Sequence, residues 1–150
     1  MRTIPNPGFA GDDGRAAPHL VAALTAYDAV PDDREAHRGA LVALANARLL
    51  VPVVAVLGEV EVDESGLAHD KTSDMAAVMM TGQDGRTALL AFTSTASLEQ
   101  WNPEARPVPV PASKAALAAV QQEAAALLVD VAGPVMFVVE GEDLIALARG

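Results

Sequence analysis

The chain has 150 residues, no cysteine and a formal net charge of −10, from 20 acidic and 10 basic residues. Its length suits one domain with a core that needs no disulfides, and the missing thiols exclude disulfides, thiolate zinc sites and cysteine nucleophiles. The negative charge opposes binding to nucleic acid or anionic lipid and favours a basic protein partner.

Residues 1–15 contain two prolines and the stretch GDDG, which predict an irregular N-terminal arm. We expect the remainder, residues 16–150, to form a single domain. Pro18 suits the first position of a helix, and an aspartate at 32 or 33 caps a second helix that runs to about residue 48. The apolar run 48–58 predicts a strand buried on both faces. EVEVD, which follows it, predicts a strand with one solvated face.

A polar connection, DESGLAHDKTSD, precedes the clearest hairpin signal in the chain. Two apolar runs, 75–81 and 87–93, flank the glycine-bounded turn GQDGR. Next we expect a short helix over 95–101, then RPVPVP as an extended segment, because the residue before a proline avoids the helical region.

The last third of the sequence predicts one long helix, a strand pair and a closing helix. Ser113 is expected to cap the long helix, and Leu117 to lie on its apolar face. LLVDVAGPVMFVVE predicts two strands joined by a Gly-Pro turn. In the closing helix, 142–149, Ile145 is expected to face inward. The fold class predicted is therefore α/β of the α+β type, with a mixed sheet, a central hairpin and helices packed against the sheet.

The sequence carries no spacing that identifies a reaction, so we expect no catalytic residue, no metal and no cofactor. Glu59, Glu61 and Asp63 would share one strand face, where carboxylates bind cations or simply solvate the strand. His69 with its acidic neighbours has no second histidine at a ligating spacing. The serines form no Gly-x-Ser-x-Gly elbow, and the glycine pairs lack a phosphate-binding pattern.

Two polar stretches are predicted to meet at one end of the sheet. In an antiparallel pair the start of one strand lies beside the end of the next, so the segment 71–75 should neighbour Phe92 to Ser94. The candidate ligand- or partner-binding residues are Lys71, Ser73, Asp74, Phe92, Thr93, Ser94 and Trp101. The structural alternative is a corner in which Asp74 clamps the loop, Lys71 pairs with it or with Glu99, and Trp101 anchors the crossover.

Five segments in this order resemble the SseB family, in particular its actinobacterial members, which correspond to the amino-terminal domain of the enhanced-serine-sensitivity protein. They are IPNPGFAGDDG, LLVPVVAVLGEVEVDESGLAHDKTSDMA, TGQDGRTALLAFTSTASLEQW, ARPVPVP and VDVAGPVMFVVEG. The resemblance implies a bacterial cytoplasmic protein of mixed α/β fold with no established enzymatic activity. It places the candidate residues in recognisable segments and assigns none of them a role.

The sequence thus favours a noncatalytic cytoplasmic interaction module, with an unknown protein partner or a second copy bound through an uncovered strand edge. The N-terminus has no signal-peptide core, and the longest apolar run is shorter than the roughly 20 residues that cross a bilayer. The alternative is a site for an amino acid or a phosphorylated metabolite. There Lys71 would supply charge, Ser73 and Ser94 hydrogen bonds, and Trp101 an apolar wall.

Overall fold

The computed structural model describes residues 12–57, 60–62, 68–70 and 73–150, and of residues 54–57, 60–62, 68–70 and 73–76 it describes the backbone alone. The helices are α1 (Pro18–Ala29), α2 (Arg34–Ala45), α3 (Thr95–Trp101), α4 (Ala112–Gln121) and α5 (Gly141–Arg149). The strands are β1 (Arg48–Leu57), β2 (Val60–Val62), β3 (Ala68–Asp70), β4 (Ser73–Ala77), β5 (Met79–Thr81), β6 (Thr87–Ala91), β7 (Arg106–Pro111), β8 (Ala126–Val129) and β9 (Phe137–Glu140). Within these ranges, none of the helices combines the length and the apolar character that crossing a bilayer requires.

The starts of α1 and α2 follow from local chemistry, as predicted. Pro18 occupies the first turn of α1, and the Asp33 side chain accepts a hydrogen bond from the Ala36 N–H at the start of α2. Ser94 caps α3. Helix α4 differs from the prediction, because it begins at Ala112 after Pro111 and so places Ser113 inside its first turn.

The strands form a mixed arrangement, which confirms the predicted α+β fold. A four-stranded sheet has the order β5-β6-β8-β9, in which β6 and β8 run parallel and the other pairs antiparallel. A three-stranded antiparallel sheet has the order β4-β1-β7. The two sheets meet where Leu50 of β1 and Phe92, just after β6, exchange backbone hydrogen bonds of 2.7 and 2.8 Å.

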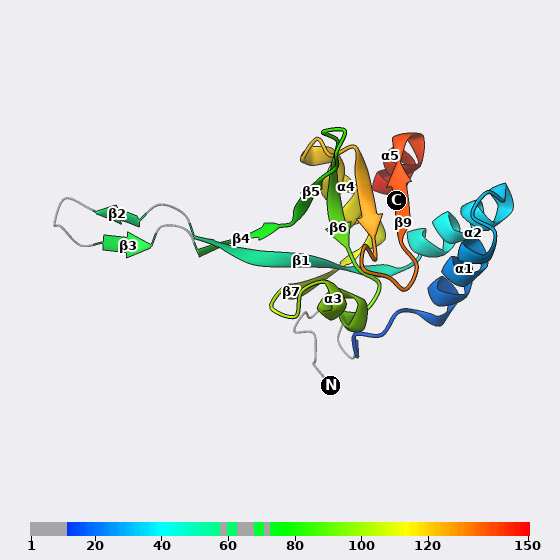
Figure 1. Ribbon diagram of the computed structural model, residues 1–150, viewed down its shortest axis with the longest axis horizontal. Coiled ribbons are helices and arrows are strands. Elements are labelled where there is room, and N and C mark those ends of the chain that lie inside the picture. The colour runs from blue at the N-terminus through cyan, green and yellow to red at the C-terminus, as the bar shows by residue number, and fades with distance from the viewer. Residues whose placement is uncertain (1–11, 58–59, 63–67, 71–72) are drawn as a thin grey trace.

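The predicted hairpin is confirmed only around its turn. Strands β5 and β6 pair, and the Gly82 N–H donates to the Arg86 carbonyl at 2.7 Å to close the turn. The preceding strand β4, however, pairs with the outer half of β1 rather than with β6. Beyond Val53 these two strands continue as a ribbon that leaves the body, with β2 and β3 further along it (Figure 1). Strand β3 lies within the stretch that the sequence predicted to be a polar connection.

Side chains of the strands alternate between two apolar clusters. One face of the sheets, with Leu89, Leu127 and Phe137, packs against α1, α2, α4 and α5. The other face, with Leu90 and Phe92, packs against α3. Figure 1 shows α4 and α5 behind the four-stranded sheet and α3 near its end.

Two residues expected to face the core lie at the surface instead. Leu117 of α4 and Ile145 of α5 are each 42% exposed, and α4 buries the alanines at 112, 115, 116 and 119. These small side chains let α4 pack closely against its neighbours, so the buried stripe of this helix carries few large residues.

Candidate functional site

The strongest polar cluster lies where the parallel strands β6 and β8 end. Thr93 follows Phe92 after β6, and Asp130 directly follows β8. Because the carboxyl ends of neighbouring parallel strands lie at the same edge of a sheet, these two residues are brought together although 37 positions separate them. Such an edge is the usual position of a binding crevice in sheets of this kind.

Asp130 accepts three hydrogen bonds inside this cluster. Its Oδ1 accepts from the Thr93 N–H at 2.8 Å and from the Ser97 hydroxyl at 2.9 Å, and its Oδ2 accepts from the Thr93 hydroxyl at 2.6 Å. All three residues are at most 5% exposed. The Asp130 backbone has a φ of 53°, a left-handed conformation that aspartate tolerates better than most residues. The carboxylate therefore ties the end of β8 to the end of β6 and to α3.

Burial raises the pKa of Asp130, because removal from water penalises the charged carboxylate. The hydrogen bonds from Thr93 and Ser97 act in the opposite direction and favour the charged form, but they do not cancel the effect of burial. No basic side chain among the described residues is in hydrogen-bonding contact with this carboxylate, since Arg48 reaches only the Thr93 carbonyl next to it.

Arg48 connects the cluster to the segment before α1. Its guanidinium donates to the Thr93 carbonyl at 2.8 Å and to the Arg15 carbonyl at 2.7 Å, and Nε lies 2.7 Å from Asp12 Oδ2. The Arg48 and Asp12 side chains are only 11% and 10% exposed. The Thr95 N–H donates to the Gly14 carbonyl at 2.7 Å. The end of the predicted irregular arm is thus fixed against β1 and α3.

Helix α3 is held by a reciprocal cap and by an aromatic contact. The Ser94 hydroxyl accepts from the Ser97 N–H at 3.1 Å, and the Ser97 hydroxyl accepts from the Ser94 N–H at 3.2 Å. At the other end, the half-buried Trp101 packs on Phe92 with ring centroids 5.6 Å apart. The aromatic pair covers part of the sheet face that α3 shields.

The structure brings together four of the seven candidate residues. They are Phe92, Thr93, Ser94 and Trp101, and each makes internal contacts. Lys71 lies outside the described residues, and the side chains of Ser73 and Asp74 are not described.

For residues 73–75, which the structure describes, the prediction that the 71–75 segment neighbours Phe92 to Ser94 is wrong. Phe92 pairs with Leu50, whereas Ser73 pairs with Leu57, seven residues further along β1. At about 3.3 Å per residue, that separation is roughly 23 Å. The predicted surface therefore divides into two parts.

Sequence reasoning missed Asp130, Ser97 and Arg48. For Asp130 a signal was available: this aspartate directly follows one predicted strand, just as the Thr-Ser-Thr stretch at 93–95 follows another. No group of three or more potential metal-ligating side chains occurs in the part of the chain that the structure describes.

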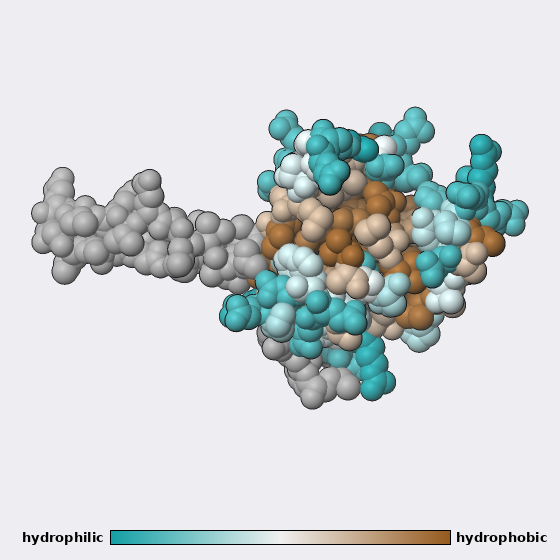
Figure 2. All heavy atoms as spheres, viewed as in Figure 1, coloured by the Kyte–Doolittle hydropathy of each residue, from teal (hydrophilic) through white to brown (hydrophobic). Residues whose placement is uncertain are grey.

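Two hollows lie near these elements. One, of about 210 Å³, is on the face of the four-stranded sheet opposite α1, α2, α4 and α5. Its lining includes Met80, Ala88, Leu128 and Val138. Figure 2 shows apolar atoms in the middle of this face, between hydrophilic atoms over the β5–β6 turn and over α3.

The second hollow, of about 260 Å³, lies between the segment before α1 and the start of α3. Arg15, Ser94, Thr95 and Glu99 contribute to its lining. The Thr95 hydroxyl oxygen is buried and has no hydrogen-bond partner among the described residues.

A comparison with protein-family models matches residues 20–146 to the family described as the SseB protein N-terminal domain. This match confirms the resemblance to the SseB family. No curated protein and no solved structure matches the chain.

Proposed function

We propose that this chain, which belongs to the SseB family, is a noncatalytic protein-interaction module of the cytoplasm. The observation that carries the proposal is the part of the apolar face of the four-stranded sheet, around Met80 and Val138, that α3 leaves exposed. An exposed apolar patch of this kind is a common feature of binding surfaces.

The face is built from two cross-strand rows. The strand registers align Met80 with Ala88, Ala88 with Ala126, and Ala126 with Glu140. The next row aligns Leu128 with Val138. In the row of Met80, Ala88, Ala126 and Glu140, the two central strands, β6 and β8, carry alanine, so a depression lies there between larger side chains. Met80 and Val138, which line this depression, are each 37% exposed. A bulky apolar side chain of a partner would fill this depression.

The use of polar groups elsewhere supports a noncatalytic role. Thr93 and Ser97 direct their hydroxyls at Asp130, and that carboxylate is almost fully buried. Groups that act on a substrate need to reach it, and these groups are committed to one another. The cluster therefore acts as a clamp that keeps β6, β8 and α3 in place.

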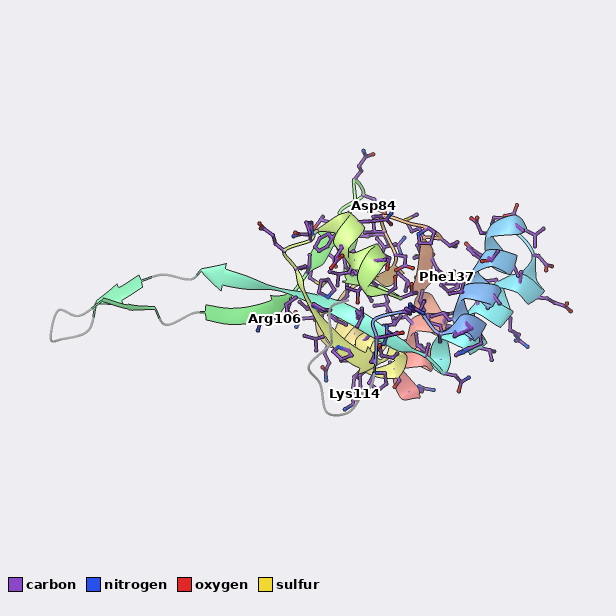
Figure 3. The ribbon with its side chains drawn as sticks, turned by 90° about the horizontal axis from the view of Figure 1, so that it is seen from below. Asp84, Arg106, Lys114 and Phe137 are labelled. Atoms are coloured by element: carbon purple, nitrogen blue, oxygen red, sulfur yellow. The ribbon has the colours of Figure 1, made fainter. Side chains whose placement is uncertain are left out.

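The charge of the rim indicates the chemistry of the partner. Asp84 and Glu140 line the depression, and Arg86, the one cation among the described residues of its lining, is paired with Glu140 at 2.9 Å. Figure 3 labels Asp84 at the β5–β6 turn. With a formal net charge of −10, the chain favours a partner segment that presents an apolar side chain beside lysine or arginine.

A differential pull-down tests this proposal. Val138→Lys places a positive charge on the apolar face, whereas Val21→Lys, on the 48% exposed Val21 of α1, is a matched control on another surface. We expect at least tenfold lower recovery of a specific partner with Val138→Lys, no change with Val21→Lys, and direct binding by the purified partner. Equal recovery of the partner with the wild type, Val138→Lys and Val21→Lys contradicts the proposal. The double variant Lys71→Ala/Asp74→Ala tests the other predicted residues in the same experiment.

The second candidate is binding of a small molecule such as an amino acid or a phosphorylated metabolite. The observation that favours it is the hollow beside Thr95, whose buried hydroxyl lacks a partner among the described residues. Arg15, which is 3.5 Å from Asp13 in the same lining, supplies a cation beside this hydroxyl. A thermal-shift screen tests it, because a ligand at 100 times its Kd stabilises by about 2.7 kcal/mol. A shift that Thr95→Val abolishes supports this function, and no shift with amino acids or phosphorylated metabolites contradicts it.

A further inference from the structure

Residues 73–81 form one continuous outer edge of the sheets. Strand β4 is at the end of the order β4-β1-β7, and β5 is at the end of the order β5-β6-β8-β9. The chain runs from β4 into β5 after a single residue, Val78. Its two partners, β1 and β6, lie on the same side, since they meet each other at Leu50 and Phe92. The opposite side of this strand has no partner among the described strands.

The hydrogen-bond pattern shows which backbone groups face that open side. Leu50 directs its N–H and carbonyl at Phe92, so the even residues of β1 face β4, and their partners Asp74 and Ala76 face β1. On either side of β5, the Val78 carbonyl accepts from the Leu90 N–H and the Gly82 N–H donates to the Arg86 carbonyl, so even positions again face inward. The odd positions 73, 75, 77, 79 and 81 therefore present their N–H and carbonyl groups outward, and none of them is proline.

The opposite edge of the β4-β1-β7 sheet is closed to strand addition. The N–H of Ala112, the residue after β7, donates to the Ala47 carbonyl just before β1. Because backbone groups alternate in direction along a strand, the even-numbered residues of β7 are those that bond to β1. The outward positions of β7 are consequently Pro107, Pro109 and Pro111, which have no N–H to donate. Figure 3 labels Arg106, where this strand begins. Proline is a usual means of protecting a sheet edge, and the 73–81 edge has none.

We infer that the 73–81 edge pairs antiparallel with the same edge of a second copy of this chain. A twofold axis at Ala77 matches all five outward positions and allows about ten new backbone hydrogen bonds. Asp74, the one charged residue of the segment, then lies opposite Met80 of the other copy, so this register opposes no like charges. The pairing uses the backbone of the edge and goes beyond the proposed interaction of the apolar face.

Introduced cysteines test the register directly, because the chain has none of its own. With the axis at Ala77, the two Ala77 Cα atoms lie about 5.5 Å apart, within the range that a disulfide spans. We expect Ala77→Cys to form a covalent dimer under mild oxidation. The matched control Met136→Cys, at a 52% exposed position on the loop between β8 and β9, should remain monomeric on a denaturing gel. Equal cross-linking of the two variants, or none with Ala77→Cys, overturns the inference.

Sedimentation gives an independent measure of the same pairing. The wild-type chain should dissociate from dimer to monomer on dilution, and Ala77→Pro should raise the dissociation constant at least tenfold. This change removes one outward N–H and spares the inward bonds of Asp74 and Ala76. A circular dichroism spectrum establishes that the variant is folded, and if it is not, the cross-linking result decides. A wild-type chain that stays monomeric at all concentrations, as expected if the edge serves another protein's strand, overturns the inference.

Discussion

At the residue scale, the Asp130 side chain is the acceptor that ties Thr93 and Ser97 together. Asp130→Ala leaves the Thr93 N–H and two hydroxyls without their acceptor, and we expect the free energy of unfolding to fall by about 2–4 kcal/mol. Asp130→Asn is the matched control, because the amide oxygen still accepts and the Thr93 hydroxyl can turn to accept from the amide. Its expected cost is below about 1 kcal/mol. Urea unfolding measures both, and equal losses would contradict the clamp.

The raised pKa of Asp130 gives a second prediction, in which the sign follows from proton linkage. The folded state holds the Asp130 proton more tightly than the unfolded state, whose carboxyl has a pKa of about 3.9. This contribution to stability is complete below that pH and is lost as pH rises through the higher folded pKa. Relative to Asp130→Asn, the wild type should therefore lose unfolding free energy as pH rises from about 4. Parallel stability curves for the two proteins would show that burial does not raise this pKa.

The sequence could indicate only part of this cluster. Thr93 and Ser94 stand out because they interrupt an apolar run, and the grouping with Phe92 and Trp101 is local enough to be read along the chain. Asp130 joins them through the parallel pairing of β6 and β8, which depends on the whole sheet order. Arg48 is 45 residues from Thr93, so its bond to that carbonyl has no local pattern either.

At the scale of elements, α3 covers one face of the sheet through Trp101. The indole packs with Phe92, Leu98 and the cluster around Leu90, and it is half-buried. Trp101→Ala should therefore lower the free energy of unfolding by about 2–4 kcal/mol, near the lower part of the range for buried aromatic residues. Trp101→Phe keeps most of the apolar contact and should cost clearly less. Thermal unfolding followed by circular dichroism compares the two, and a neutral Trp101→Ala would place the ring outside the core.

The predicted hairpin is confirmed over β5 and β6 but is shorter than predicted, because the strand 73–81 changes partners, which a period-two pattern cannot reveal. Extension of the β1–β4 register would place Pro52 opposite Val78 in a hydrogen-bonded pair. Proline has no N–H for that bond, and the Val78 carbonyl accepts from Leu90 instead. The strand therefore pairs with β1 before this point and with β6 after it. The turn GQDGR was predictable because glycine and aspartate set its geometry locally.

At the scale of the whole molecule, Arg48 joins parts of the chain that no sheet connects. Its guanidinium holds Asp12 and the Arg15 carbonyl on one side and the Thr93 carbonyl on the other. The Asp130 clamp, β1 and the segment before α1 are thus parts of one contact network. The sequence predicted residues 1–15 to be irregular, and residues 12–15 do lack helix and strand. Their fixed position comes from Arg48, through contacts that cross from one end of the chain to its middle.

This network predicts unequal roles for two neighbouring aspartates. Asp12→Ala leaves the Arg48 guanidinium, 11% exposed, without its carboxylate, and loss of one partner of a buried pair typically costs about 3–5 kcal/mol. Asp13 is the control, because its side chain is 49% exposed and lies 3.5 Å from an exposed Arg15. Asp13→Ala should change the free energy of unfolding by less than about 0.5 kcal/mol.

The fluorescence of Trp101, the single tryptophan, reports the unfolding of Asp12→Ala and Asp13→Ala in urea. In the double variant Asp12→Ala/Arg48→Met no charge remains buried, so its loss of stability should be smaller than the sum of the two single losses. Equal effects of Asp12→Ala and Asp13→Ala would mean that the segment before α1 does not depend on Arg48. Additive losses in the double variant would mean that the ion pair contributes no coupling between the arm and the sheet.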